Sequence, residues 1–141
     1  MRRNLKPADL GDLLEQVRNA VLATHHRDGS ILLSPVWHEW RDGGFTVLAG
    51  ANDIKIRQLR RDARASIVVA EDLPPYRGIE VRGEARIFTP KDLTEHERIS
   101  IHYLGPDKGK EYAAGTDPAS LALIRIVPGV LRAWDFADEW A

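Results

Sequence analysis

Hydrophobic and polar residues follow two different periods along the chain. Over residues 79–88 every second position is apolar or small, and Glu or Arg residues lie between them. This alternation predicts a strand with one buried and one solvated face. Over residues 53–64 the apolar residues recur instead at helical spacing, with arginines on the other side, which predicts an amphipathic helix. Similar patterns predict strands over residues 20–26, 31–40, 45–49, 65–70, 121–127 and 130–136, and helices over residues 7–18, 89–103 and 107–116.

Turn signals between these segments indicate how the strands are connected. Asp28-Gly29 and Asp42-Gly43 supply the positive φ angles that tight turns need. Pro35 cannot donate a hydrogen bond to a neighbouring strand, so residues 31–40 must form an edge strand, a bulge or a bend. About seven strands joined by short turns favour a mainly β fold, an antiparallel barrel with helices packed outside it. No linker or repeat interrupts the pattern, so we expect a single domain over residues 1–141.

Composition and charge narrow the class of protein. Of the 141 residues, 43% are hydrophobic and 29% are charged, which is typical of a globular domain. Cysteine is absent, which excludes disulfides, thiolate metal sites and cysteine nucleophiles. The net charge of −1 gives no reason to expect attraction to nucleic acids or membranes. No apolar run approaches the roughly 20 residues of a membrane span, and no signal-peptide core follows the basic N-terminus, so we expect a cytoplasmic protein.

The segment from Ala49 to Arg57 is the first candidate binding site. A predicted strand ends there, a loop of small residues follows, and a helix begins that Asn52 or Asp53 can cap. Unpaired backbone amides at the start of a helix favour an anion. Lys55, in the first turn, lies at the margin of the buried stripe, where its ammonium group can reach toward the barrel. Two interpretations remain open, a phosphate site and a capped surface helix whose basic residues are solvated.

Motifs for other chemistry are weak or absent. The chain has no nucleophile elbow, no Walker phosphate loop and no dinucleotide-binding glycine pattern. His25 and His26 are adjacent on a strand and point to opposite faces, while His96 and His102 lack the spacing of a zinc pair, so we expect no metal site. If the protein is an enzyme, the difficult chemistry belongs to a cofactor.

The arginines of the second helix admit three interpretations. They are Arg57, Arg60, Arg61 and Arg64. No exposed aromatic residues alternate with them to stack on bases, which disfavours nucleic-acid binding. A solvated helix face is favoured, and contact with the polyanionic tail of a ligand is the intermediate possibility. Aromatic residues on strands and loop ends can line the pocket of a flat ring or simply pack in the core; they are Trp37, Trp40, Tyr76, Trp134 and Phe136.

Several short motifs, in order along nearly the whole chain, resemble those of one family. They are Val21-Leu22-Ala23-Thr24, Arg27-Asp28-Gly29, Ser34-Pro35-Val36-Trp37, Lys55-Ile56-Arg57-Gln58-Leu59-Arg60-Arg61-Asp62, Ala65-Ser66-Ile67-Val68-Val69, Pro75-Tyr76-Arg77-Gly78-Ile79-Glu80-Val81-Arg82-Gly83 and Trp134-Asp135-Phe136. Together they resemble the pyridoxamine 5′-phosphate oxidase-like split β-barrel, in the branch of small actinobacterial flavin- and deazaflavin-dependent oxidoreductases.

The resemblance implies a six- to seven-stranded antiparallel split barrel that forms a homodimer, with cofactor sites at the subunit interface. It implies an FMN- or F-420-dependent reductase that transfers a hydride to a small organic acceptor. The cofactor, with F-420 preferred over FMN, carries the reaction, so no catalytic side chain and no metal is assigned. The implied cofactor-binding residues are Ser34, Pro35, Val36, Trp37, Ala49, Gly50, Ala51, Asn52, Lys55 and Arg57. The substrate side is assigned to His38, Tyr76, Arg77 and Trp134, the last three in part from the other subunit.

One residue departs from the pattern of the F-420-binding relatives. They often carry an Arg two positions before the Lys, where this chain has Asp53. A carboxylate there repels a phosphate unless it turns away to cap the helix. Arg60, Arg61 and the basic N-terminus could still attract the polyglutamate tail of F-420. The alternative function is a non-enzymatic protein that binds a flavin, a deazaflavin or a haem-type ligand.

Overall fold

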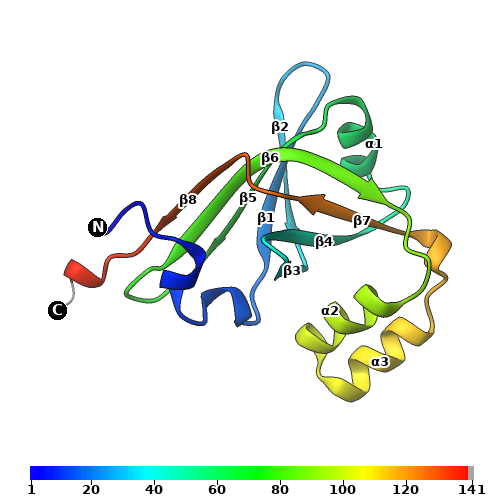
Figure 1. Ribbon diagram of the computed structural model, residues 1–141. Helices are drawn as coiled ribbons and strands as arrows, with labels where there is room; N and C mark the ends of the chain where they lie inside the picture. Colours follow the sequence, from blue (N-terminus) through cyan, green and yellow to red (C-terminus); the bar gives the residue numbers. More distant parts are fainter. Residues whose placement is uncertain (140–141) are drawn as a thin grey trace.

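The computed structural model describes residues 1–139 as one curled antiparallel sheet with helices at its margin (Figure 1). The strands follow the order β2-β1-β5-β6-β7-β4-β3, and β8 pairs with β6 beside this path. Their bounds are β1 Ala20–His25, β2 Ile31–Val36, β3 His38–Arg41, β4 Gly44–Gly50, β5 Arg64–Ala70, β6 Gly78–Phe88, β7 Leu121–Ile126 and β8 Val130–Trp134. The mainly β antiparallel split barrel expected from the sequence is thereby confirmed, and the described residues form eight strands where six or seven were expected.

Strand β6 joins the two halves of the sheet. Its first half pairs with β5 on one side and with β8 on the other, while its last four residues, 85–88, pair with β7. The alternation that predicted this strand is present, because Ile79, Val81 and Ala85 are buried and Arg82 and Glu84 are exposed. One long strand therefore carries the chain from the first half of the barrel into the second.

The barrel core consists of the inward-facing residues of these strands. Phe45 and Val47 of β4, Ile67 of β5 and Ile124 of β7 are all buried completely or almost completely. The predicted amphipathic helix is also present, as α1 (Ile54–Arg61), and it buries Ile56 on the same core.

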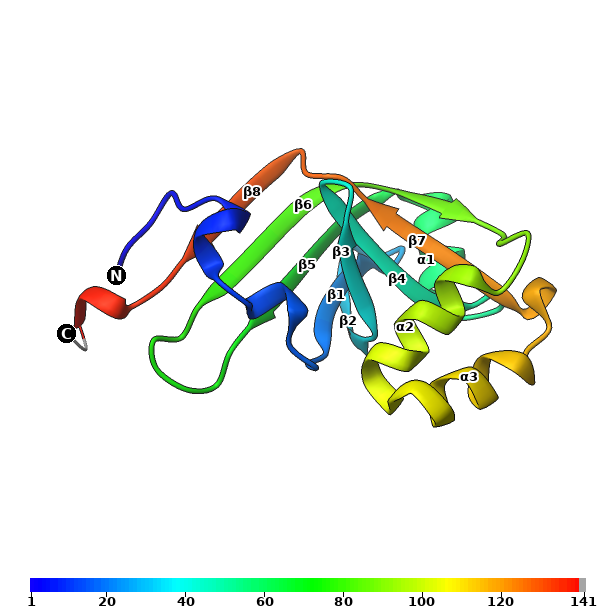
Figure 2. The same cartoon turned by 60° about the horizontal axis from the view of Figure 1, so that its bottom comes forward.

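Two further helices form a hairpin at one end of the sheet (Figure 2). They are α2 (Thr94–Leu104) and α3 (Pro106–Ala114), with Gly105 between them. The helix expected from residue 89 begins five residues later, because residues 89–93 form a connection in which the Asp92 side chain accepts a hydrogen bond from the Thr94 amide. Within residues 1–139 no helix has the length and apolarity needed to cross a membrane.

The prediction of one helix over residues 7–18 was wrong. The segment forms two short 3-10 turns instead, η1 (Pro7–Leu10) and η2 (Leu13–Glu15). Gly11 between them has a φ of 59°, a conformation that ends a right-handed helix. The Leu10 carbonyl accepts a hydrogen bond from Arg77 rather than from a following helical amide. Leu10 and Leu13 are nevertheless buried, as the hydrophobic stripe predicted.

The prediction of a single strand over residues 31–40 was also wrong. The segment is interrupted at Trp37 and forms two strands, β2 and β3. Pro35 lies on β2, which is an edge strand, as its missing amide hydrogen requires. The last strand ends at Trp134 rather than residue 136, because Asp135 bridges to Arg2 near the N-terminus. Two further 3-10 turns are η3 (Pro118–Ser120), which precedes β7, and η4 (Ala137–Glu139), at the end of the described residues.

Candidate cofactor-binding site

A cavity of about 260 Å³ lies where the β2–β3 connection, the end of β4, the start of α1 and the helix hairpin meet. Six of the residues assigned to cofactor binding line it together: Pro35, Val36, Trp37, Ala49, Gly50 and Lys55. The remaining lining residues are Leu48, Asp53, His96, Tyr112, Thr116 and Leu121. Segments separated by as many as 86 positions thus form one surface.

Trp37 forms an aromatic wall of this cavity together with the helix hairpin. Its ring is stacked on Tyr103 of α2, with centroids 4.7 Å apart and an angle of 3° between the planes. Tyr112 of α3 lies at a tilt, 6.0 Å from the Trp37 ring. The Tyr103 hydroxyl donates to the Arg18 carbonyl and accepts from the His38 amide, which holds the stack in place. Stacked aromatic residues of this kind suit a flat conjugated ligand.

Asp53 and Lys55 form an ion pair at the opposite edge of the cavity. The Asp53 carboxylate accepts from the Lys55 ammonium group at 2.9 Å and from the Gly50 amide at 3.0 Å. It makes no side-chain hydrogen bond that caps α1, so the expected capping role is wrong for this side chain. Burial tends to raise the pKa of Asp53, but the hydrogen bonds from Lys55 and Gly50 outweigh burial and hold the pKa below its usual range. The carboxylate is therefore ionised at neutral pH.

Three of the residues predicted to bind the cofactor are neighbours in sequence of cavity residues but do not line the cavity. The Ala51 amide donates to the Ser120 carbonyl at 2.9 Å and is not directed to a ligand. Ser34, Ala51 and Asn52 lie next to the cavity in the chain but do not line it.

His96, which the sequence analysis did not assign, contributes a buried imidazole to the cavity. The Thr116 hydroxyl donates to the Tyr112 carbonyl, so its oxygen accepts from Nε2 of His96 at 3.0 Å. Ser100 then donates to Nδ1 at 2.9 Å, and burial lowers the pKa of His96. A neutral ring with its proton on Nε2 satisfies both hydrogen bonds. The spacing of His96 and Ser100 on one helix was visible in the sequence, but the cavity that His96 shares with Leu48 and Ala49 of β4 was not.

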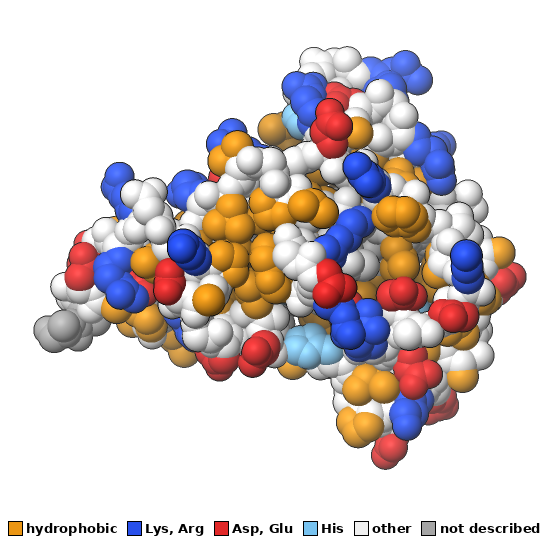
Figure 3. Space-filling model, viewed as in Figure 1, with side chains coloured by type: hydrophobic (Ala, Val, Ile, Leu, Met, Phe, Trp, Pro, Cys, Tyr) orange, Lys and Arg blue, Asp and Glu red, His pale blue; other side chains and the backbone are white. Residues whose placement is uncertain are grey.

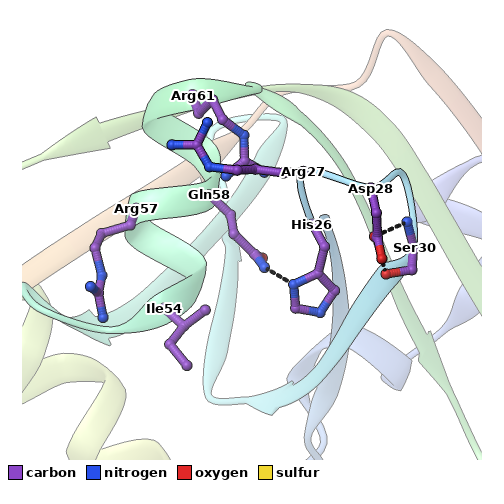
Figure 4. Close-up of a pocket in the computed structure, with 8 residues that line it drawn as sticks. All are labelled: His26, Arg27, Asp28, Ser30, Ile54, Arg57, Gln58 and Arg61. Carbon is purple, nitrogen blue, oxygen red and sulfur yellow. Dashed lines mark hydrogen bonds between the residues drawn. The ribbon is translucent and has the colours of Figure 1, made fainter.

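Arg57 lies in a different cleft, between the β1–β2 hairpin and α1 (Figure 4). This cleft has a volume of about 710 Å³, and Arg27 and Arg61 also line it. Buried Gln58 donates to Nδ1 of His26 at 2.8 Å, while its own oxygen accepts from the Thr24 hydroxyl. The structure therefore separates Arg57 from the cavity that contains Lys55.

His38 is buried beside a third cavity, of about 210 Å³, that Arg98 and His102 also line. Among the described residues, neither of its ring nitrogens has a hydrogen-bond partner of normal geometry. Burial lowers the pKa of His38 to about 4, although the nearby Arg18 carbonyl partly opposes this shift. His38 is therefore neutral. Its ring lies edge-on to Tyr103, and it lines a different cavity from Lys55.

The other residues assigned to the substrate side lie apart from the Lys55 cavity within one chain. Tyr76 has a positive φ of 54° and packs edge-on against Phe136. Arg77 donates to both carboxylate oxygens of Glu71. Trp134 lies under the Arg132 guanidinium, 4.5 Å from its ring centroid. Their assignment to a second subunit stays a prediction.

Comparison with known proteins identifies relatives of this fold. The sequence profile of pyridoxamine 5′-phosphate oxidase matches residues 7–135. A conserved hypothetical protein from Mycobacterium tuberculosis is 26% identical, with a TM-score of 0.80 over 97% of this chain and 89% of its own. An F-420 reductase is 23% identical, with a TM-score of 0.72 over 85% and 93%. The haem storage protein HutZ from Vibrio cholerae is 16% identical, with a TM-score of 0.68 over 89% and 92%. No curated protein matches the chain.

Proposed function

Because the chain belongs to the pyridoxamine 5′-phosphate oxidase family, we propose that it is an oxidoreductase whose flavin-type cofactor occupies the Trp37 cavity. The observation that carries the proposal is the stacked Trp37–Tyr103 pair beside a cavity that six of the expected residues line. When bound, such a cofactor supplies hydride transfer to or from a small organic acceptor. F-420 is the preferred cofactor and FMN the second candidate, in keeping with the branch that the motifs resemble.

The residues around the cavity fit the ring of such a cofactor better than they fit a phosphate. Trp37, Tyr112 and Leu48 provide aromatic and apolar surface for a flat ring. The Lys55 ammonium group, which is the natural phosphate ligand, is already paired with Asp53. The side chains therefore bind and orient a ring and exclude water around it, while Lys55 and Asp53 determine the charge at its edge.

A second copy of the chain completes the site in this proposal. A cavity of about 260 Å³ is smaller than the roughly 300–1,000 Å³ of pockets that enclose a whole ligand of this size. Ile31, Leu33 and Pro35 alternate on the outer face of edge strand β2, and Pro35 also lines the cavity. Leu33 and Pro35 pair with Ala23 and Val21 of β1, which extends the apolar surface across the sheet. Figure 3 shows hydrophobic side chains gathered near the middle of one face of the molecule.

We expect Leu33→Glu to convert a dimer into a monomer. Leu33 is 65% exposed in the single chain. A two-fold interface on this face contains one Leu33 side chain from each subunit, so the substitution changes two contacts. Losing two leucine contacts of about 1.5–3 kcal/mol each raises the dimer dissociation constant more than about 100-fold. Sedimentation at several protein concentrations measures this change. Val17→Glu, at another exposed apolar position outside β2, is the control and should leave the dimer intact. A dimer of unchanged stability in the Leu33 variant would exclude this face.

Binding of the ring is tested by filling the cavity. Leu48 lines it from β4, so Leu48→Trp occupies the space that a ring needs. Overfilling by such a side chain costs about 1–3 kcal/mol, so we expect affinities for riboflavin, FMN and F-420 to fall about 5- to 150-fold. Fluorescence titration measures all three. Thr46→Trp, two residues earlier on the same strand and outside this cavity, is the matched control. Equal affinities for the wild-type protein and the Leu48 variant would place the ring elsewhere.

A carrier that binds the cofactor without turnover is the second candidate function. It is favoured by one observation, that both nitrogens of His96, the imidazole lining the cavity, are engaged by Thr116 and Ser100. The haem storage protein among the structural neighbours illustrates such a role on a related fold. Mixing the protein with reduced F-420 and a quinone acceptor separates the two candidates. Sustained oxidation that depends on the acceptor supports the oxidoreductase, and tight binding without oxidation supports the carrier.

A further inference from the structure

The donors around Lys55 are already used within the chain. The Lys55 ammonium group and the Gly50 amide both donate to Asp53, and the Ala51 amide donates to the Ser120 carbonyl. Only 16% of the Lys55 side chain is exposed, so its ammonium group has little freedom to turn elsewhere. A ligand phosphate that reaches this edge of the cavity therefore meets donors that already have an anionic acceptor.

The Asp53 carboxylate is held closely in this position. A Cβ atom on Gly50 would lie 2.8 Å from Oδ1 of Asp53, so the absence of a side chain at residue 50 makes the approach possible. An aspartate at the start of a helix commonly accepts hydrogen bonds from the next amides of that helix. Asp53 instead turns back to the end of β4 and toward Lys55, where it acts as an internal anion.

We infer that Asp53 is a specificity-determining residue whose carboxylate occupies the position of a ligand phosphate and disfavours dianionic phosphate monoesters. This inference rests on the proposed flavin-type site. A phosphate monoester carries a charge of about −1.5 to −2 at pH 7 and must displace the carboxylate or remain beside it uncompensated. A ring without phosphate meets no such penalty. A phosphodiester, as in F-420, carries a single negative charge and is disfavoured less than the monoester of FMN.

Riboflavin and FMN form a matched pair of probes, because they share the ring and the ribityl chain and differ in the phosphate. In the wild-type protein we expect FMN to bind no more tightly than riboflavin. In Asp53→Asn the amide oxygen still accepts from the Gly50 amide, but Lys55 loses its anionic partner. We expect FMN to bind that variant about 10- to 150-fold more tightly than riboflavin, as a charge-assisted contact allows. The riboflavin dissociation constant should stay within about threefold of the wild-type value.

Asp53→Ser is a second variant that removes the charge and keeps a residue suited to the start of a helix. It should show the same preference for FMN, and circular dichroism of both variants checks that the fold is intact. An unchanged ratio of FMN to riboflavin affinity in both variants would overturn the inference while leaving the ring site in place. Wild-type protein that already binds FMN more than tenfold tighter than riboflavin would also overturn it. If neither riboflavin nor FMN binds any of the three proteins, the inference fails, and a titration with F-420 decides whether the proposed function fails with it.

Discussion

Replacing Arg77 with alanine is expected to lower the free energy of unfolding by about 3 kcal/mol. Its guanidinium donates to both oxygens of Glu71 and to the Leu10 carbonyl, and it pairs with Asp12. The Glu71 side chain is only 7% exposed, so the variant leaves a buried carboxylate without its cation. Breaking a buried pair costs about 3–5 kcal/mol, and the low end applies because the Arg77 side chain is 19% exposed. Urea unfolding followed by circular dichroism measures the change.

The pH dependence of this loss identifies its cause. The Arg77 guanidinium holds the pKa of Glu71 below its ordinary value, so the pair stabilises the wild-type protein above that ordinary value. The stabilisation is lost as the pH falls through the lowered pKa of the folded state. The difference in the free energy of unfolding between the wild-type protein and Arg77→Ala should therefore become smaller at acidic pH.

Arg64→Ala is the control for a surface ion pair. Arg64 binds Asp62 through several hydrogen bonds, but its side chain is 70% exposed. An exposed pair contributes roughly 0–1 kcal/mol, so this variant should unfold almost as the wild type does. If both variants lost the same free energy of unfolding, the buried Arg77–Glu71 pair would stabilise the fold no more than an exposed ion pair does. A normal unfolding energy combined with lost turnover would instead favour the substrate-side role that the resemblance implies for Arg77.

Replacing Lys55 with alanine is expected to weaken the binding of FMN by about 1.5–3 kcal/mol, or roughly 10- to 150-fold. The variant loses the ammonium group and leaves the Asp53 charge uncompensated beside the phosphate. F-420 should lose less affinity than FMN, because its phosphodiester carries one charge. Fluorescence titration at constant salt measures both ligands, since exposed charges are screened by ions.

Riboflavin provides the internal control for Lys55→Ala, because it has no phosphate for the uncompensated Asp53 charge to repel. Its dissociation constant should stay within about threefold of the wild-type value. Arg57→Ala is the matched protein control, since Arg57 lies on the same helix but lines the other cleft. If riboflavin weakened as much as FMN, Lys55 would be supporting the ring pocket rather than offsetting the Asp53 charge beside the phosphate. If only Arg57→Ala weakened FMN, the phosphate would lie in the arginine-lined cleft.

The asymmetry between Lys55→Ala and Asp53→Asn follows from one ion pair. The first substitution leaves a negative charge near a ligand phosphate, and the second leaves a positive charge there. The two variants should therefore shift FMN affinity in opposite directions while riboflavin affinity stays almost constant. A general loosening of the β4–α1 connection would weaken both ligands in both variants.

Much of the barrel was predictable from residue patterns, because burial alternates with a short local period. The alternation over residues 79–88 predicted β6, and the stripe containing Ile56 and Leu59 predicted α1. Lys55 was correctly located in the first turn of that helix for the same reason. The N-terminal helix failed because a hydrophobic stripe specifies which residues are buried, whereas Gly11 sets the backbone that presents them.

The partners of charged and aromatic side chains were not predictable in this way. Arg77 meets Leu10 and Asp12 across more than 60 residues, and Trp37 meets Tyr103 across a similar distance. Such contacts depend on how distant segments pack, and no local period encodes them. Asp53 and Lys55 are only two residues apart, yet the direction of the Asp53 side chain depends on where β4 ends at Gly50. The pattern of residues thus places a cation at the start of a helix, and the fold provides its anion from within the chain.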